Sequence, residues 1–416
     1  MTKITDIPAI RFKGFSDTWE QRKFGEVFDC TVPNNTLSRA ELSYDEGTVL
    51  NVHYGDVLIK YGSVLDVQKD DIPRIPHRCR EDFNGALLQD GDVIIADTAE
   101  DETTGKACEI GNLQGSAIVS GLHTMVCRPR NRMALGYLGY YLNSNAYHHQ
   151  LLPLMQGIKV LSLSRSNIQK TSVSYPSAMK EQQLIASYFS QLDHLITLHQ
   201  RKYNKLTNVK KSMLEKMFPQ NGSNVPEIRF KGFTEAWEQR KLGEIGSVSM
   251  CRRIFKEQTS ENGEIPFYKI GTFGGEADAF ISRELFEEYK AKYQYPKKGD
   301  ILISASGSIG RTVVFTGKNE YFQDSNIVWL NHDKHLDNSF LKCFYSIVKW
   351  AGIEGSTIKR LYNDNILNTA ITLPSVEEQQ KIGAYFENLD NLITLHQREL
   401  EKLKNLKKAC LEKMFV

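Results

Sequence analysis

Two pairs of matching segments recur within the 416-residue chain and constrain its fold more than any other feature of the sequence. The short repeat, Arg11 to Glu26, returns at an offset of 218 as Arg229 to Glu244, with 12 of 16 positions identical. The long repeat, Glu181 to Phe218, returns at an offset of 197 as Glu378 to Phe415, with 25 of 38 positions identical. Short repeat, variable region and long repeat follow one another twice, and joining the two ends would close a circle. This order predicts a pseudo-twofold, circular arrangement.

The repeats divide the chain into six segments, and its length exceeds what one hydrophobic core usually organises. The segments are the first short repeat (1–26), the first variable domain (27–176), the first long helix (177–218), a linker with the second short repeat (219–244), the second variable domain (245–374) and the second long helix (375–416). We expect an α+β (mixed) protein, with two globular α/β domains separated by two long helices that form an antiparallel coiled coil.

Both variable domains show the same rhythm of apolar runs. Strands are predicted at 56–61, 92–97 and 116–120, and again at 267–272, 300–304 and 312–315. A helical stretch follows near 134–150 and near 338–352, and each domain ends in a short strand with the sequence VSYP or ITLP. The two domains are therefore expected to share one fold.

The long repeats carry apolar or amphipathic residues at alternating spacings of four and three, the pattern of a coiled-coil seam. A helix of about 40 residues spans roughly 60 Å and would space the two variable domains. The alternative is that these helices mediate homodimerisation of an otherwise unrelated protein. The two histidines of the seam either fix the register of the coiled coil or tilt so that the ring is solvated. The predicted seam consists of Ile185, Phe189, Leu192, Ile196, His199 and Leu206 in the first helix and Ile382, Phe386, Leu389, Ile393, His396 and Leu403 in the second.

Signals for the ends of these helices are also present. Ser375 and Glu378 have the spacing of a capping box, and Pro219 follows the first long helix, where a proline cannot continue it. Trp19 and Trp237, one in each short repeat, are expected to pack against the coiled coil rather than to recognise a ligand.

Composition restricts the function classes. The net charge is only +2, and the first variable domain with its flank (27–180) holds 14 basic and 17 acidic side chains, so DNA binding would need help from partners. The seven cysteines are scattered without a C-x-x-C pair, which predicts no metal site and a reducing, cytoplasmic location. No run of eighteen apolar residues predicts a membrane segment.

The segments IRFKGF, WEQRKLGE and LPSVEEQQKIGAYFENLDNLITLHQ resemble the repeated regions of Type I restriction-modification specificity subunits, and the resemblance covers essentially the whole chain. It implies two target-recognition domains that each read one half of a bipartite site in double-stranded DNA. It also implies two modification (methyltransferase) subunits docked on the long helices, and restriction (translocase and nuclease) subunits. S-adenosylmethionine, ATP and Mg²⁺ would belong to those partners.

No catalytic residue is predicted in this chain. The sequence has no N/D-P-P-Y/F tetrapeptide for methyl transfer, and the stretch from Gly310 to Lys318 lacks the spacing of a phosphate-binding loop. Two alternatives stay open: a DNA-binding scaffold of another defence or regulatory system, and an enzyme in its own right, against which the missing motifs argue.

Base recognition needs donors and acceptors at the groove edges, so the candidates are cations in polar loops of the variable domains. Adjacent cations beside Ser, Thr and Asn, such as Arg252 with Arg253 and Lys359 with Arg360, are the strongest pairs. The full set of predicted DNA-binding residues is Arg74, Arg78, Arg80, Lys106, Lys159 and Arg165 in the first domain and Arg252, Arg253, Lys256, Arg311, Lys359 and Arg360 in the second.

Overall fold

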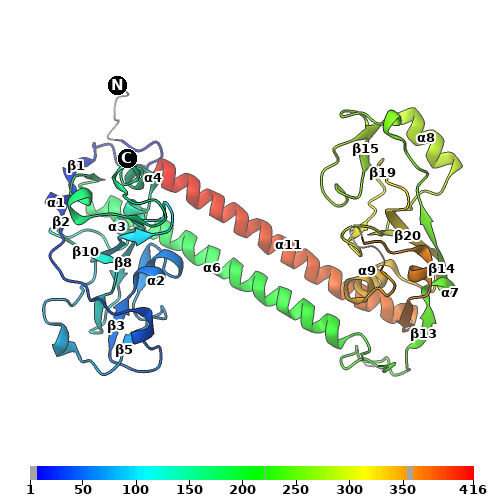
Figure 1. The fold of residues 1–416 in the computed structure, drawn as a ribbon, viewed down its shortest axis with the longest axis horizontal. Coiled ribbons are helices and arrows are strands. Elements are labelled where there is room, and N and C mark those ends of the chain that lie inside the picture. Colours follow the sequence, from blue (N-terminus) through cyan, green and yellow to red (C-terminus); the bar gives the residue numbers. More distant parts are fainter. Residues whose placement is uncertain (1–6, 221, 354–358) are drawn as a thin grey trace. The chain divides into compact units, whose positions relative to one another are not determined.

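The computed structural model describes residues 7–220, 222–353 and 359–416, and the chain divides into two compact units (Figure 1). Unit 1 comprises the residues up to 200 together with 398–416, and unit 2 comprises residues 201–397. Each unit contains parts of both long helices, α6 (Met179–Lys216) and α11 (Val376–Lys413). We call the part of unit 1 before α6 head 1, and the part of unit 2 between α6 and α11 head 2.

Head 1 is built from short strands and short helices. Its main sheet has the order β2-β10-β6-β8-β4, a second sheet has the order β5-β3-β9, and two further pairs are β1-β12 and β11-β7. The strands are β1 (Glu20–Lys23), β2 (Phe28–Asp29), β3 (Val49–Val52), β4 (Val64–Asp66), β5 (Arg74–Ile75), β6 (Val93–Ala96), β7 (Thr98–Ala99), β8 (Ala107–Gly111), β9 (Ala117–Ser120), β10 (Thr124–Pro129), β11 (Leu161–Ser162) and β12 (Ser172–Tyr175). The helices are α1 (Phe24–Val27), α2 (Tyr54–Ile59), α3 (Tyr137–Leu142), α4 (Asn145–His148), α5 (Arg165–Ile168) and the 3₁₀ turns η1 (Arg39–Glu41), η2 (Arg80–Phe83) and η3 (Leu152–Leu154).

Head 2 repeats this plan with one strand fewer in the main sheet. The sheets have the orders β14-β20-β17-β18 and β16-β15-β19, and β13 pairs with β21. The strands are β13 (Glu238–Lys241), β14 (Gly246–Met250), β15 (Ile265–Tyr268), β16 (Phe280–Ile281), β17 (Ile301–Ser304), β18 (Thr312–Val314), β19 (Tyr321–Phe322), β20 (Ile327–His332) and β21 (Ala370–Leu373). The helices are α7 (Leu242–Ile245), α8 (Arg283–Lys292), α9 (Asn338–Ile347), α10 (Asn363–Leu367) and the 3₁₀ turn η4 (Lys256–Gln258).

Strand pairing confirms that the heads share one fold. β3 pairs in parallel with β9 and antiparallel with β5, and β15 pairs in the same two ways with β19 and β16. In each head, the strand of the short repeat pairs antiparallel with the last strand of the head. β1 pairs with β12, with Glu20 opposite Tyr175, and β13 pairs with β21, with Glu238 opposite Leu373. The expected α+β class with two related α/β domains is therefore confirmed.

The end of the long helix from the other half of the sequence completes the core of each head. In unit 1, Phe415 lies beyond the end of α11 and packs against Trp19, Tyr137 and Phe189. In unit 2, Phe218 lies beyond the end of α6 and packs against Trp237 and against Phe340 of α9. Both tryptophans are buried, as their place in the short repeats predicts.

A buried ion pair joins the short repeat to the long helix in each unit. Arg11 donates to Glu181 through Nε at 2.6 Å and Nη2 at 2.9 Å, and Arg229 donates to Glu378 in the same bidentate way at 2.7 and 2.8 Å. The side chains of Glu181 and Glu378 are each only 1% exposed. Bidentate pairs fix both distance and angle, so each short repeat is held at one orientation on its helix.

Glu378 forms only half of the predicted capping box. Its backbone N–H donates to Ser375 Oγ at 3.3 Å, as expected, but its carboxylate binds Arg229 instead of returning to the start of the helix. The bidentate interaction with a buried guanidinium is stronger than one bond to a neutral N–H.

The parts of the two long helices that share a unit pair antiparallel. In unit 1, Tyr188 contacts Cys410 and Asp193 accepts from Lys407, so residue numbers rise along α6 as they fall along α11. Of the predicted seam, the members nearest the heads are buried and the members farther along the helices are half-buried. The buried members are Ile185, Phe189, Leu192, Ile382, Phe386 and Leu389; the half-buried members are Ile196, His199, Leu206, Ile393, His396 and Leu403. A register-fixing role of the histidines stays a prediction.

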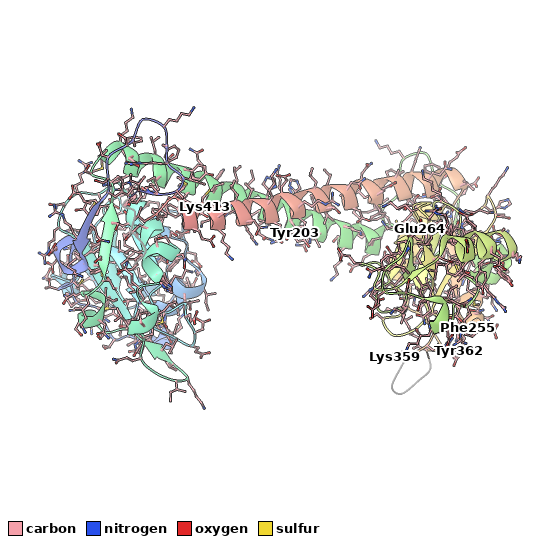
Figure 2. All side chains as sticks on the ribbon, turned by 90° about the horizontal axis from the view of Figure 1, so that it is seen from above. Tyr203, Phe255, Glu264, Lys359, Tyr362 and Lys413 are labelled. Carbon is pink, nitrogen blue, oxygen red and sulfur yellow. The ribbon has the colours of Figure 1, made fainter. Side chains whose placement is uncertain are left out.

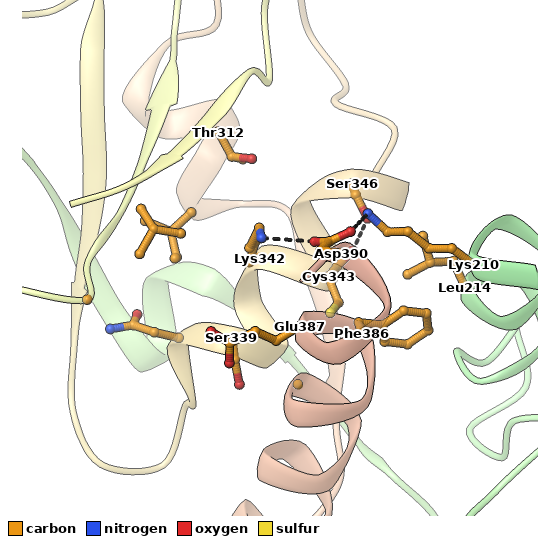
Figure 3. A pocket seen from close by; sticks show the side chains of 15 residues that line it. Lys210, Leu214, Thr312, Ser339, Lys342, Cys343, Ser346, Phe386, Glu387 and Asp390 are labelled. Carbon is orange, nitrogen blue, oxygen red and sulfur yellow. Dashed lines mark hydrogen bonds and ion pairs between the residues drawn. The ribbon is translucent and has the colours of Figure 1, made fainter. Parts of the chain in front are cut away.

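The same Asp–Lys pair of the long repeat recurs where each head meets the helices. In unit 2, Asp390 binds Lys210 of α6 at 2.5 Å and Lys342 of α9 at 3.0 Å, at the wall of a cavity of about 300 Å³ (Figure 3). In unit 1, the equivalent Asp193 binds Lys407 at 2.5 Å, and Tyr140 of α3 donates to it at 2.9 Å. These aspartates therefore link three elements in each unit.

One strand prediction is wrong. Residues 56–61 were expected to form a strand because they are a short apolar run, but they belong largely to helix α2, which His53 Nδ1 caps by accepting from Gly55 N–H at 3.2 Å. A short apolar run fits a buried helix as well as a buried strand. The predicted strand at 267–272 begins earlier, as β15, and ends at Tyr268.

Among the described residues, no helix is both long enough and apolar enough to cross a membrane.

We predict that Glu378→Gln destabilises unit 2 by about 3 kcal/mol, because it leaves the Arg229 guanidinium buried without its counter-ion. Urea unfolding followed by tryptophan fluorescence measures this, since Trp237, Trp329 and Trp350 all lie in head 2. The neighbouring exposed Glu377→Gln is the matched control and should leave the unfolding midpoint unchanged. Equal midpoints for both variants would contradict a structural role of the ion pair.

The Asp390 junction predicts a pH dependence. Burial acts to raise the pKa of Asp390, but the ammonium groups of Lys210 and Lys342 outweigh it and leave the pKa below its ordinary value. A lowered pKa means that the carboxylate stabilises the folded chain at neutral pH and that this contribution is lost as the pH falls below about 4. The difference in thermal midpoint between the unmodified chain and Asp390→Asn should therefore be constant from about pH 7 to pH 5 and shrink toward pH 3. A difference that stays constant down to pH 3 would contradict this.

Candidate nucleic-acid interface

Three of the predicted cations of head 2, Arg253, Lys359 and Arg360, lie on one surface. Arg253 Nε lies 3.8 Å from Asp324 Oδ2, and Arg360 Nη2 donates to Ser325 Oγ at 2.6 Å, so two guanidinium groups distant in sequence are held by consecutive residues. Lys359 precedes Arg360, whereas the guanidinium carbon of Arg252 lies 5.2 Å from the centre of the Tyr293 ring and is not part of this set. We call this surface the cationic face; it comprises residues 253–255, 306–307, 324–326 and 359–362.

Backbone and polar side chains fix the loops of the cationic face. Gly307 N–H donates to the carbonyl of Lys359 at 3.0 Å, and Leu361 N–H donates to Ala305 at 2.8 Å. Ser306 Oγ donates to Asn326 Oδ1 at 2.8 Å. The face thus combines guanidinium donors with hydroxyl and amide groups, the side-chain types that contact phosphates and base edges.

Aromatic side chains are interleaved with these cations. Phe255 is 55% and Tyr362 47% exposed, and the guanidinium carbons of Arg253 and Arg360 each lie 5.8 Å from the centre of the neighbouring ring. Figure 2 shows Phe255, Tyr362 and Lys359 at the same edge of head 2. Sequence reasoning missed both aromatics, although their place beside basic pairs, in RRIFK and KRLY, was a usable signal.

The other two candidates of head 2 lie outside this set. Lys256 opens η4 and is exposed. Arg311 donates through Nη1 to the carbonyl of Phe273 at 2.6 Å, and its side chain therefore holds a loop of its own head.

Lys106 occupies the position in head 1 that Arg311 occupies in head 2, since Ala96 N–H donates to Lys106 O and Ser304 N–H donates to Arg311 O, both at 2.9 Å. Lys106 lies in a loop, as predicted, but its side chain points inward instead of toward solvent. It is half-buried and donates to the carbonyls of Leu58 and Tyr61, and burial together with the Lys407 ammonium lowers its pKa.

The remaining candidates of head 1 do not form one cluster. Arg74 lies in β5 and donates to Tyr44 O, and Arg80 lies in η2 and donates to Gly115 O. Arg78 is exposed between them, and Lys159 is exposed beside the fully exposed Ile158. Arg165 is exposed too, but it begins helix α5 and does not stand in a loop as predicted. DNA binding by any of the twelve predicted residues stays a prediction.

The surface of head 1 that corresponds to the cationic face has a different chemistry. Asn34 Nδ2 donates to Gly121 O at 3.2 Å, and His123 Nδ1 lies 3.5 Å from Asp97 Oδ1. Nearby cations that sequence reasoning missed are paired with acids: Arg39 with Asp56 at 2.5 Å, and Lys60 with Asp71 at 2.8 Å. The two heads therefore present different donors and acceptors on one shared fold.

Within residues 7–220, 222–353 and 359–416, no group of three or more His, Cys, Asp or Glu side chains is placed to hold a metal ion.

Comparison with known proteins gives a consistent result. The family model described as type I restriction modification DNA specificity domain matches residues 16–208 and again 234–405, so each match contains most of one head and most of one long helix. A protein of Haemophilus influenzae provisionally named a type I restriction enzyme specificity subunit is 60% identical over 158 residues, which are 37% of this chain and 41% of that protein. This chain thus spans less than half of that relative in the match.

Two broader likenesses cover nearly the whole chain. The protein of Methanocaldococcus jannaschii provisionally named the type I restriction enzyme MjaX specificity subunit is 23% identical over 98% of this chain and 93% of its own length. The crystal structure of the type I restriction-modification system S subunit from M. genitalium shares the fold, with a TM-score of 0.63, 14% identity and 99% of both chains covered. The family model matches most of the chain, and the chain therefore belongs to the type I restriction modification DNA specificity family.

Proposed function

We propose that this chain supplies sequence specificity to a type I restriction-modification complex, with each head reading one half of a bipartite site in duplex DNA. The observation that carries the proposal is that the two heads share one fold but carry different side chains on the cationic face of head 2 and on the corresponding surface of head 1. A shared fold places the reading loops equivalently, and different donors and acceptors on those loops select different bases.

The proposed role is non-catalytic. The modification subunits would supply methyl transfer with S-adenosylmethionine, and the restriction subunits would supply translocation and cleavage with ATP and Mg²⁺. The near-neutral charge of the chain supports a division of this kind, because a protein that binds duplex DNA alone usually carries a strong excess of positive charge. The complex would work in the cytoplasm, where the DNA lies.

The long helices would set the separation of the two half-sites and dock the modification subunits. Each helix has 38 residues, which corresponds to roughly 57 Å of helix. The Asp–Lys pairs at Asp193 and Asp390 support this role, since they fix how far one helix can slide along the other within each unit. Co-purification of this chain with a methyltransferase that modifies DNA only in its presence tests the assignment.

We predict that Arg360→Ala lowers the affinity of the assembled complex for its own site about tenfold more than its affinity for random duplex, because a base contact is lost together with charge. Equilibrium binding to both duplexes at fixed salt measures this. Arg283→Ala is the matched control, since Arg283 is exposed on α8 of the same head and pairs with Glu264. Equal losses on both duplexes would mark Arg360 as a phosphate contact.

A further inference from the structure

The two exposed aromatics of the cationic face occupy positions where head 1 builds the same turn with serine. The first position precedes a 3₁₀ turn. Phe255 N–H donates to Gln258 Oε1 at 2.9 Å, and Ser38 N–H donates to Glu41 Oε2 at 2.8 Å. Five residues later, Ser260 and Ser43 each bridge to the equivalent strand of their head. Phe255 and Ser38 are therefore structurally equivalent.

The second position precedes a short helix. Tyr362 is the residue before α10, and Leu361 N–H donates to Ala305 O at 2.8 Å. Ser164 is the residue before α5, and Leu163 N–H donates to Asp97 O at 2.8 Å. Tyr362 and Ser164 have nearly the same backbone angles, with φ of −84° in both and ψ of 158° and 150°.

The fold does not require a ring at either position, because head 1 forms the same turns without one. At the second position the ring even replaces a stabilising contact: Ser164 Oγ accepts from Asn167 N–H at 3.2 Å, whereas Tyr362 forms no side-chain cap. Head 2 thus exposes two large apolar surfaces that neither its core nor its turns use. A role in binding explains them better than a role in folding.

The surroundings of the rings indicate what they bind. Each ring lies beside a guanidinium, and Ser325, Asn326 and Lys359 belong to the same face. Duplex DNA matches this pattern, since phosphates attract the cations while the methyl groups of thymine in the major groove offer apolar contact to aromatic side chains. An apolar docking site for a protein would be depleted in charge at its centre.

We propose that Phe255 and Tyr362 contact the bases of the half-site read by head 2 and determine its specificity through apolar contact. This assignment rests on the proposed function. Head 1 has serine at both positions and reads its half-site by other groups. The guanidinium groups of Arg253 and Arg360 would position the rings through their stacking contacts and, at the same time, contact the DNA backbone or a base edge.

Grafting the residue of head 1 tests the assignment. Phe255→Ser and Tyr362→Ser, each in the full chain assembled with its modification subunits, should weaken binding to the complex's own site about tenfold and leave binding to random duplex unchanged. The dependence of affinity on salt should not change, since no charge is removed, whereas Arg360→Ala should lower the salt slope by about one if it contacts a phosphate. Tyr362→Phe keeps the ring and should retain specific binding.

Measuring the unfolding midpoint distinguishes a loss of DNA recognition from a loss of stability. The unfolding midpoint of Tyr362→Ser should not fall, because serine restores a helix cap. If Phe255→Ser unfolds more easily, Phe255→Gln takes its place. Equal loss on both duplexes, or failure of the variants to assemble with the modification subunits, would overturn the assignment, and the latter would mark a protein contact. If the unmodified complex itself prefers no sequence, the proposed function fails instead.

Discussion

The buried arginine–glutamate pair between short repeat and long helix is the interaction on which the rest of the structure depends. It occurs twice, as Arg11 with Glu181 and Arg229 with Glu378, and it ties three things together. The short repeat supplies the strand that closes each head, the helix carries the coiled-coil seam, and the far end of the other helix fills the core of the head. Removing one partner would leave the other charge without its counter-ion in a largely buried position, so the pair stabilises the fold around it.

Apart from these repeated contacts, the two heads differ in the side chains of their loops and turns. Head 1 and head 2 share one pattern of strand pairing, yet one candidate surface carries Arg253 and Arg360 with exposed rings, and the other carries Asn34, His123 and Asp97. Under the proposed function, assembly uses the repeated residues, and DNA recognition uses residues that need satisfy only a local turn.

Much of the architecture could be predicted from the sequence, because repeats and heptads are local patterns that translate directly into helices and duplicated domains. The strand prediction for residues 56–61 is wrong because a run this short, with four apolar residues of six, does not distinguish a strand from a helix. The candidate site was harder to predict, because contacts between residues far apart in the sequence bring its side chains together. Arg253 and Arg360 meet only through Asp324 and Ser325, which no spacing reveals, and Lys106 is drawn inward by two carbonyls at the end of α2. Phe255 and Tyr362 are structurally equivalent to Ser38 and Ser164 of head 1, and this equivalence shows in the turns but not in the sequence.

The central claim is that two dissimilar heads read two separate half-sites. Base-resolution methylome sequencing of cells that carry this chain with its modification subunits tests it most directly, before and after residues 245–374 are replaced by another domain of the same family. The account predicts a split methylated motif in which only one half changes upon replacement. An unbroken motif, or a simultaneous change in both halves, would contradict it.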